Sequence, residues 1–322
     1  MEKNFKNLIM MDWSDRWPNA RSLSDSNPEP FSTTELSDIT GEDWSHLPLP
    51  SLAYQSVQGD VTLRQMMMNQ WYKNSTANDV LLTAGAQEAL FVAFNALIKA
   101  DDHVVCFTPI FEPLSLMPEQ IGARVTKLPL QSDWSIEFES LETALKDDAK
   151  LLVLNFPHNP TGAHIDLNTL TKIINLCDQN GVYILSDEVF RGLEHEPQNR
   201  LPAVADLYHR AVSLGVLSKA FALPAVRLGW LLSQDKALLK RMIEIKNHLS
   251  ICVSGLDVSF MKKMMPHNEA LWQRSIDIIN KNKRRLEGAL QHNDNFQCHM
   301  GSASGTCFVF TKDAAHWSET LA

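Results

Sequence analysis

The stretch of this 322-residue chain best suited to chemistry is a lysine next to a serine, with an arginine eight positions later. Residues 211–214 form an apolar run that predicts a buried strand leading into Ser218, Lys219 and Arg227. A lysine among apolar neighbours has its charged form disfavoured, so its pKa can fall and its neutral amine can attack a carbonyl carbon. The serine hydroxyl and the planar arginine fork are suited to holding a phosphate. The stretch therefore predicts a carbonyl-reactive amine beside a phosphate pocket.

Two earlier strands are predicted to end in polar side chains. After Lys150, residues 151–154 form a continuous apolar run that leads to the Asn159-Pro160-Thr161-Gly162 turn, and residues 182–185 lead to Asp187. Branched strands that are buried on both faces are typical of parallel sheets, and ligands of such sheets lie beyond the carboxyl ends of the strands. A carboxylate at the end of a buried strand is costly unless it pairs with a cation. Asn159 and Asp187 are therefore candidates for ligand contacts.

A third candidate element is the small-residue turn between a predicted strand at 80–83 and a predicted helix that continues to about residue 99. Gly85, Ala86 and Gln87 fall at the start of this helix. Backbone N–H groups at a helix N-terminus are free to bind an anion, and the helix dipole adds positive potential there. This turn is a second candidate contact for a phosphate.

In order along the chain, these motifs resemble those of the class I/II aminotransferases, which are fold-type I enzymes dependent on pyridoxal 5′-phosphate (PLP). The resemblance rests on three features: the motif Ser-Lys-x-x-x-x-Pro-x-x-Arg-x-Gly, the motif Asn-Pro-x-Gly, and the strand that ends in Asp187. The resemblance implies that PLP is the cofactor, that Lys219 and Asp187 are catalytic, and that Lys219 forms the internal aldimine. Asp187 would keep the ring nitrogen protonated, which makes PLP an electron sink. The implied cofactor-binding residues are Tyr54, Gly85, Ala86, Gln87, Phe111, Asn159, Asp187, Ser218, Lys219 and Arg227.

The resemblance also implies a homodimer. Tyr54 begins a Tyr-x-x-x-x-Gly-x-x-x-Leu-Arg pattern, and the corresponding tyrosine of the family reaches the PLP phosphate of the partner subunit. Phe111 stands where an aromatic side chain of the family stacks on the pyridine ring. Taken alone, the residues favour a packed tyrosine before an amphipathic helix and a core phenylalanine after a strand.

The chain departs from the family pattern at three places. Phe190 stands where a tyrosine usually donates a hydrogen bond to the phenolic oxygen of PLP, and Val216 stands where a phosphate-binding serine is common. Phenylalanine cannot donate, so we expect the pKa of the aldimine to rise. After Phe310 no arginine follows that could bind the α-carboxylate of a substrate. We expect either that the chain is a fragment or that this group is supplied differently.

The predicted fold is α/β, with a mostly parallel sheet, helices on both of its faces, and a smaller, incomplete α+β domain. Three parts are predicted along the chain. Residues 1–50 are an N-terminal arm and part of the small domain, residues 51–245 are the large PLP-binding domain, and residues 246–322 are an apparently truncated small domain. Within the arm, Ser32 and Glu35 predict a capped helix over 32–39.

Composition narrows the class of protein. The net charge is −9 and the pI is about 5.6, which argues against nucleic acid or an anionic membrane as a partner. No apolar run approaches the roughly 20 residues of a membrane span, and the apolar patch near the N-terminus is too short for a signal peptide. Five cysteines without a Cys-x-x-Cys pair are typical of reduced thiols. We therefore expect a cytoplasmic enzyme.

The predicted function is PLP-dependent transfer of an amino group between an amino acid and a 2-oxo acid. Two alternatives stay open. One is a PLP-dependent lyase or cyclase on the same fold. The other is a catalytically impaired homologue that binds PLP, which Phe190 and the missing arginine favour. The amino acid and the 2-oxo acid cannot be named from the residues.

Overall fold

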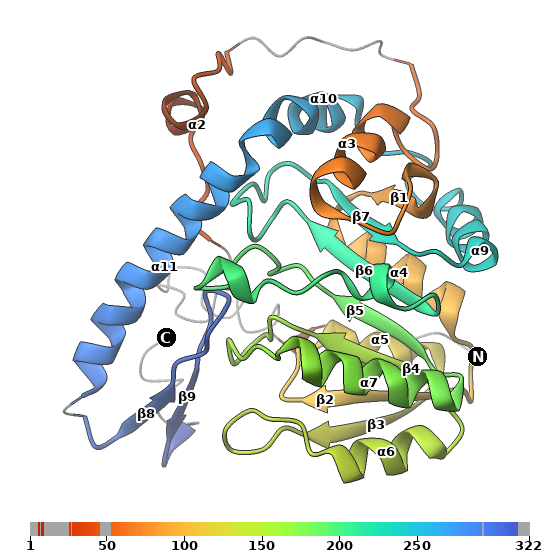
Figure 1. Ribbon diagram of the computed structural model, residues 1–322, viewed down its shortest axis with the longest axis vertical. Helices are drawn as coiled ribbons and strands as arrows, with labels where there is room; N and C mark the ends of the chain where they lie inside the picture. Colours follow the sequence, from red (N-terminus) through yellow and green to blue (C-terminus); the bar gives the residue numbers. More distant parts are fainter. Residues whose placement is uncertain are drawn as a thin grey trace.

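The computed structural model describes residues 6, 8, 9, 26, 28–45, 53–291 and 293–314. Much of the predicted N-terminal arm at 1–50, and residues 315–322 of the predicted small domain, lie outside the described residues. A seven-stranded sheet forms the centre of the molecule (Figure 1). Its strands are β1 (Val80–Thr83), β2 (His103–Thr108), β3 (Arg124–Pro129), β4 (Ala149–Asn155), β5 (Tyr183–Asp187), β6 (Ala211–Val216) and β7 (Gly229–Leu232).

The strand order across the sheet is β1-β7-β6-β5-β4-β2-β3. All neighbouring pairs are parallel except those made by β7, which is antiparallel to both β1 and β6. The carboxyl ends of the six other strands and the amino end of β7 therefore meet at one edge of the sheet. This edge is where ligands of open α/β sheets are bound.

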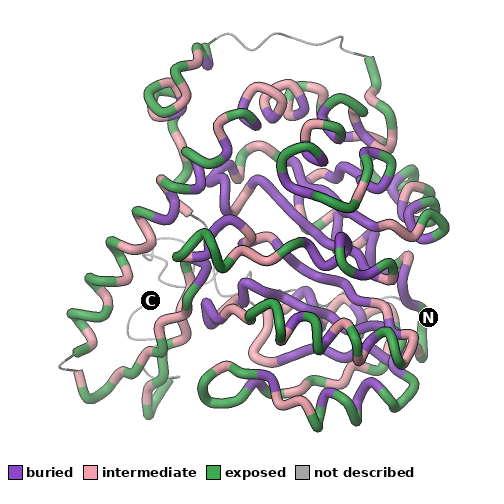
Figure 2. The backbone as a smooth tube through the Cα atoms, in the orientation of Figure 1, coloured by how far each residue is buried: buried purple, intermediate pink, exposed green. Residues whose placement is uncertain are grey.

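Both faces of the sheet are buried, as the apolar runs predict. In β4, Leu151 and Val153 belong to one hydrophobic core, and Leu152 and Leu154 belong to the other. Successive side chains of a strand point to opposite faces, so a run without polar residues is stable only between two layers of helices. The buried backbone of the central strands is purple in Figure 2.

Helices cover each face of the sheet. One layer consists of α4 (Gly85–Leu97), α5 (Pro113–Ile121) and α9 (Lys236–Lys246). Its apolar side chains belong to the same hydrophobic core as Leu151 of β4. The other layer consists of α3 (Val61–Trp71), α6 (Phe138–Lys146), α7 (Leu167–Asn180) and the short α8 (Val204–Leu207). Its apolar side chains belong to the same hydrophobic core as Leu152 of β4. Gly181 ends α7 with φ +67°, a left-handed C-cap conformation that glycine adopts without strain.

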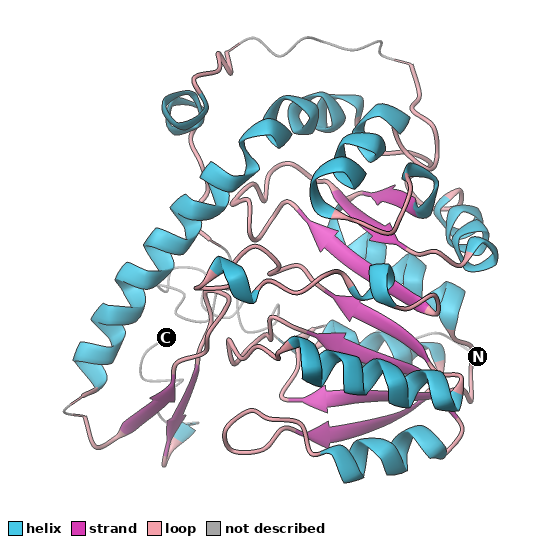
Figure 3. Cartoon of the chain, in the orientation of Figure 1, coloured by secondary structure: helices cyan, strands magenta, loops and turns pink. Residues whose placement is uncertain are grey.

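A long helix and a hairpin lie at one side of the sheet (Figure 1). Helix α10 (Gly255–Met264) leads into the long α11 (Asn268–Leu290), which runs down to a hairpin of β8 (Phe296–His299) and β9 (Phe308–Thr311) (Figures 1 and 3). Short 3₁₀ helices occupy Ala77–Asp79, Pro197–Asn199 and Met265–His267. The arm helix α2 (Thr33–Thr40) begins at the predicted Ser32–Glu35 capping box. None of the helices in the described ranges is long and apolar enough to cross a membrane.

Candidate active site

Three strands present a row of paired residues at the ligand-binding edge of the sheet. Gly229 of β7 pairs with Thr83 of β1 on one side and with Val216 of β6 on the other. The predicted phosphate contacts lie next to this row. Gly85 comes two residues after Thr83, Ser218 two residues after Val216, and Arg227 two residues before Gly229. The register of the sheet thus brings together residues that are more than a hundred positions apart in the chain.

Gly85 and Arg227 are in direct contact. Gly85 has φ +81°, and a Cβ built on it would lie 2.5 Å from Nη2 of Arg227. A side chain at position 85 would therefore fill the space of the guanidinium, which only glycine leaves open. Nη1 of Arg227 donates hydrogen bonds to Pro224 O at 2.9 Å and to Ser218 Oγ at 3.3 Å. We call Gly85, Ala86, Gln87, Ser218 and Arg227 the phosphate cradle.

The remaining cradle residues lie in the first turn of α4. Gln87 is exposed and Ala86 is half-buried. Within this turn the backbone N–H groups have no partner inside the helix, and the dipole of the 13-residue α4 favours an anion at its N-terminus. The cradle thus combines a helix N-terminus, a hydroxyl and an exposed guanidinium.

Lys219 begins a tight turn directly after the cradle serine. The backbone N–H of Ala222 donates to Lys219 O at 3.0 Å. Nζ of Lys219 donates to Oγ of Ser26 at 2.9 Å and lies 5.9 Å from the centre of the Phe190 ring. The lysine is therefore half-buried between the N-terminal arm and an aromatic ring that occupies the position of the expected tyrosine. No sequence pattern points to Ser26 as a contact of this lysine.

Asp187 lies at the carboxyl end of β5 and is 2% exposed. Burial raises the pKa of this carboxyl to about 7, while the backbone N–H of Val189, which donates to Oδ1 at 3.1 Å, and the charge of Lys219 both lower it. The charge of Lys219 thus acts on Asp187, although less strongly than burial does. A buried carboxyl with a raised pKa is suited to a cationic partner.

Asn155 links the two predicted strand-end residues and was missed by the sequence analysis. It is the last residue of β4, pairs with Asp187 of β5 and is 2% exposed. Its Nδ2 donates to Asp187 O at 3.2 Å, and its Oδ1 accepts from the backbone N–H of Asn159 at 2.9 Å. Asn155 thereby holds the Asn159 turn next to the end of β5. A polar residue at the end of an apolar strand, four positions before Asn159, was the available signal.

Two predicted residues lie outside this cluster of contacts. Phe111 follows β2 and is half-buried against the core that contains Leu151. Tyr54 precedes α3 and is 86% exposed, so the described part of its own chain leaves most of it uncovered. The structure of one chain therefore brings together Gly85, Ser218, Lys219, Arg227, Asp187 and Asn159, and it leaves Tyr54 facing outwards.

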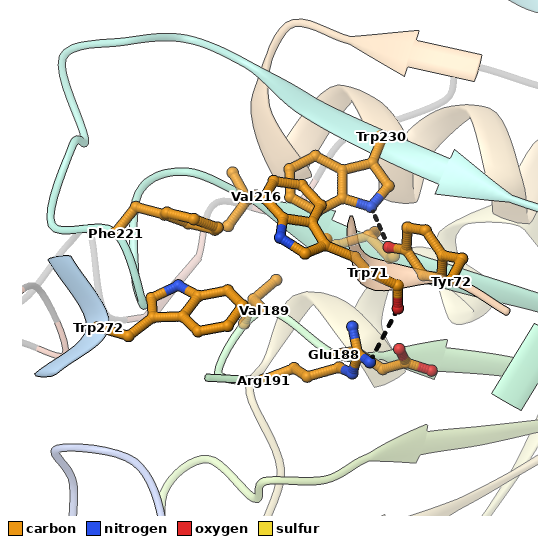
Figure 4. Close-up of a pocket in the computed structure, with 11 residues that line it drawn as sticks. Trp71, Tyr72, Glu188, Val189, Arg191, Val216, Phe221, Trp230 and Trp272 are labelled. Atoms are coloured by element: carbon orange, nitrogen blue, oxygen red, sulfur yellow. Dashed lines mark hydrogen bonds between the residues drawn. The ribbon is translucent and has the colours of Figure 1, made fainter. Parts of the chain in front are cut away.

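A small cavity of about 20 Å³ lies beside Phe221 (Figure 4). Trp71, Phe221, Trp230 and Trp272 surround it, and the ring of Phe221 lies 5.2 Å from that of Trp272 and 5.3 Å from that of Trp71. The volume suits about one water molecule and is far too small for a cofactor. These rings instead fix Phe221, which is two residues after Lys219, and so support the lysine turn.

The residues present fit PLP. The cradle offers donors for a phosphate, Lys219 offers an amine for the aldehyde, and Asp187 offers a carboxylate for the ring nitrogen. The close contact between Gly85 and Arg227 leaves no space for a side chain in the cradle. In the described part of the chain, no group of three or more His, Cys, Asp or Glu side chains is placed to hold a metal ion.

The chain belongs to the aminotransferase class I and II family, whose sequence profile matches residues 50–319. Capreomycidine synthase of Streptomyces vinaceus is 30% identical over 286 residues, which cover 88% of this chain and 70% of that protein. Arginine–pyruvate transaminase AruH of Pseudomonas aeruginosa is 30% identical over 187 residues, which cover 55% of this chain and 47% of that protein. The match thus spans less than half the length of this second relative.

Solved structures share the fold. A PLP-dependent aminotransferase from Streptococcus suis superposes with a TM-score of 0.86 at 21% identity, over 96% of this chain and 83% of that one. The PLP-dependent cyclase OrfR superposes with a TM-score of 0.84 at 24% identity, over 93% of this chain and 79% of that one. The fold is that of the fold-type I PLP enzymes, and the family's cofactor is PLP, as predicted.

Proposed function

We propose that this chain is a PLP-dependent aminotransferase that moves an amino group between an amino acid and a 2-oxo acid. The observation that carries the proposal is the convergence at one sheet edge of the Lys219 amine, the buried Asp187 carboxyl and the Gly85–Arg227 contact. The similarity to named transaminases supports the reaction class. The identity of the amino acid and of the 2-oxo acid is not part of the proposal.

When bound, PLP supplies an electron sink that stabilises negative charge at the α carbon of an amino acid. The chain's own residues would do the rest. Asp187 would hold a proton at the ring nitrogen. Burial alone favours the neutral carboxyl and raises its pKa, and a cationic partner would offset this by stabilising the ionised form. The phosphate cradle anchors the other end. Lys219 takes the proton from the α carbon of the substrate and returns one, as general base and then general acid.

Phe190 would shape this proton transfer. Its ring is 1% exposed and faces Nζ of Lys219. An apolar ring excludes water from one side of the amine, and it offers no proton that could compete with Lys219 as the acid. In the proposed site, proton movement near the substrate therefore falls to Lys219.

A second candidate reaction is cyclisation of an amino acid on the same site. It is favoured by the similarity to capreomycidine synthase, which extends over 88% of this chain, whereas the match to AruH extends over 55%. Cyclases and transaminases share the need for a lysine that moves the α proton. The site residues described above do not discriminate between the two.

The test is a product assay on the PLP-loaded protein with a panel of amino acids, with and without a 2-oxo acid. Transamination predicts a new 2-oxo acid and conversion of PLP to pyridoxamine phosphate. Cyclisation predicts a cyclic product with PLP retained, and elimination predicts free ammonia. The Lys219→Ala variant should be inactive in each case. PLP binding without turnover of any amino acid would overturn the proposal in favour of an impaired homologue.

We also propose that the chain works as a homodimer in which Tyr54 serves the site of the partner. The support is the 86% exposure of Tyr54, which leaves a large amphipathic side chain available to a second copy.

A further inference from the structure

A fully buried lysine lies behind the phosphate cradle, at a place that no motif indicates. Lys246 is at the end of α9, and its side chain is 0% exposed. Its Nζ lies 3.3 Å from both carboxylate oxygens of Glu88, which is on α4, and also donates to Oγ of Ser250. The side chain of Glu88 is 11% exposed. A charged pair this far from water is costly to bury, and solvent screens it little.

The carboxylate of this pair is part of the turn that forms the cradle. Glu88 lies in the first turn of α4 and accepts a hydrogen bond from the backbone N–H of Ala84 at Oε2. Ala84 immediately precedes Gly85, and the guanidinium of Arg227 occupies the space where a Cβ of residue 85 would lie. Glu88 therefore fixes the backbone of the turn, and it also places a negative charge beside the N–H groups that would receive a phosphate.

These two effects oppose each other. A helix N-terminus attracts anions, but an uncompensated carboxylate there repels a phosphate carrying nearly two negative charges. Lys246 removes this conflict, because its ammonium lies against the carboxylate without blocking the bond to Ala84. The pair keeps the turn fixed and leaves the cradle without an excess negative charge.

We propose that Lys246 is a positioning residue for the cofactor phosphate, acting by neutralising Glu88. This inference rests on the proposed PLP site. It predicts that the two charges of the pair have opposite effects on phosphate binding, whereas a purely structural ion pair would affect only the stability of the fold. Removing the lysine charge should weaken phosphate binding, and removing the carboxylate charge should not, although either single change breaks the same ion pair.

The experiment compares the affinities of PLP and of pyridoxal, which lacks the phosphate, by absorbance titration of the apo protein. Lys246→Met should lower the affinity for PLP about ten-fold while leaving the affinity for pyridoxal unchanged. Glu88→Gln retains an acceptor for Ala84 and should bind PLP at least as tightly as the unchanged protein, despite a lower melting temperature. The double variant should recover the PLP-to-pyridoxal ratio of the unchanged protein.

Lys236→Met is the matched control, because Lys236 is on the same helix and pairs with Asp79, but its side chain is 62% exposed. It should leave the ratio unchanged. If Lys246→Met alone does not fold, Glu88→Gln decides the matter, because the ammonium of Lys246 then lacks its carboxylate and should raise the affinity for PLP above that of the unchanged protein without raising the affinity for pyridoxal. An equal loss of PLP and pyridoxal binding in Lys246→Met, or a weaker PLP affinity in Glu88→Gln, would overturn the inference. Failure of the unchanged protein to bind PLP would instead overturn the proposed function, and the inference with it.

Discussion

The guanidinium of Arg227 occupies the space that a side chain at Gly85 would need, with Nη2 2.5 Å from the position of the missing Cβ. The two residues flank different strands, Gly85 after β1 and Arg227 before β7, and they meet because Thr83 pairs with Gly229. Their contact is the most specific piece of geometry in the cradle, and it has a direct consequence for mutation.

Gly85→Ala should displace Arg227 and weaken PLP binding by one to two orders of magnitude, since a charge-assisted phosphate contact is worth roughly 1.5–3 kcal/mol. The positive φ adds strain of about 1 kcal/mol to the folded state. Absorbance titration with PLP measures the first effect, and urea denaturation measures the second. Unchanged PLP affinity in a folded Gly85→Ala protein would show that Arg227 does not bind the phosphate.

Asp187→Asn should change the pH dependence of the apo protein's stability. The carboxyl has a pKa of about 7 in the folded chain against its usual 3.8, so it binds its proton more tightly when folded. Its contribution is fully present below about pH 4 and is lost as the pH rises through 7, a loss of roughly 4 kcal/mol at most.

Asparagine does not titrate, so this slope should be absent in the variant. Urea denaturation of both apo proteins at several pH values between 4 and 8 gives the difference, in which the contributions of the other groups cancel. Parallel stability curves for the two proteins would contradict the raised pKa of Asp187.

Phe190→Tyr should alter the spectrum of the PLP-loaded protein. The new hydroxyl would lie near Nζ of Lys219 and could donate to an acceptor oxygen of the cofactor, which favours the deprotonated form of the lysine–cofactor bond. We expect the pH midpoint of the visible absorbance band to fall by about one unit. Phe107→Tyr, a buried change within β2, is the control and should leave the midpoint in place.

Arg274→Met should loosen the N-terminal arm that reaches Lys219. From α11, the guanidinium donates to Glu29 O at 2.6 Å and to Oε1 of Glu35 at 3.1 Å, and it lies 4.4 Å from the ring centre of Phe31. Without these bonds, local opening of the arm becomes less costly. Cleavage by chymotrypsin at Phe31 should accelerate several-fold, and KM for the amino acid should rise more than kcat falls. Arg285→Met, on an exposed part of the same helix, should change neither.

Mixing two inactive variants tests the proposed dimer. Tyr54→Ala removes the residue offered to the partner, and Lys219→Ala removes the amine of the chain's own site. A mixed dimer would hold one site with both residues intact, so random exchange of subunits should restore about a quarter of the unmutated rate. Activity that stays at the level of the separate variants after subunit exchange would show that Tyr54 serves no partner.

The sequence predicts the strands, the capped helices and the strand-end residues well, because these depend on local patterns. Apolar runs indicate β4, β5 and β6, and Ser32 and Gly181 mark helix ends where the structure has them. The family resemblance adds the order of the site residues. The convergence of Gly85, Ser218 and Arg227 then follows from sheet register, which no local pattern contains.

Contacts between distant helices could not be predicted in this way. Lys246 and Glu88 are 158 positions apart, and nothing in the residues around either of them distinguishes it from a solvent-exposed charge. Arg274 and Ser26 are similar cases, because their partners come from the N-terminal arm. Long-range polar pairs depend on the packing of whole elements, and they are therefore visible only in three dimensions.

The row formed by Thr83, Gly229 and Val216 also means that the phosphate cradle exists only in the folded protein. Its members come from three strands, and they adjoin only after the antiparallel β7 has inserted between β1 and β6. An unfolded chain thus has no affinity for the phosphate, and a ligand that binds only the native state raises the free energy of unfolding in proportion to the logarithm of its concentration. The lifetime of this protein in a cell should accordingly track the supply of vitamin B6.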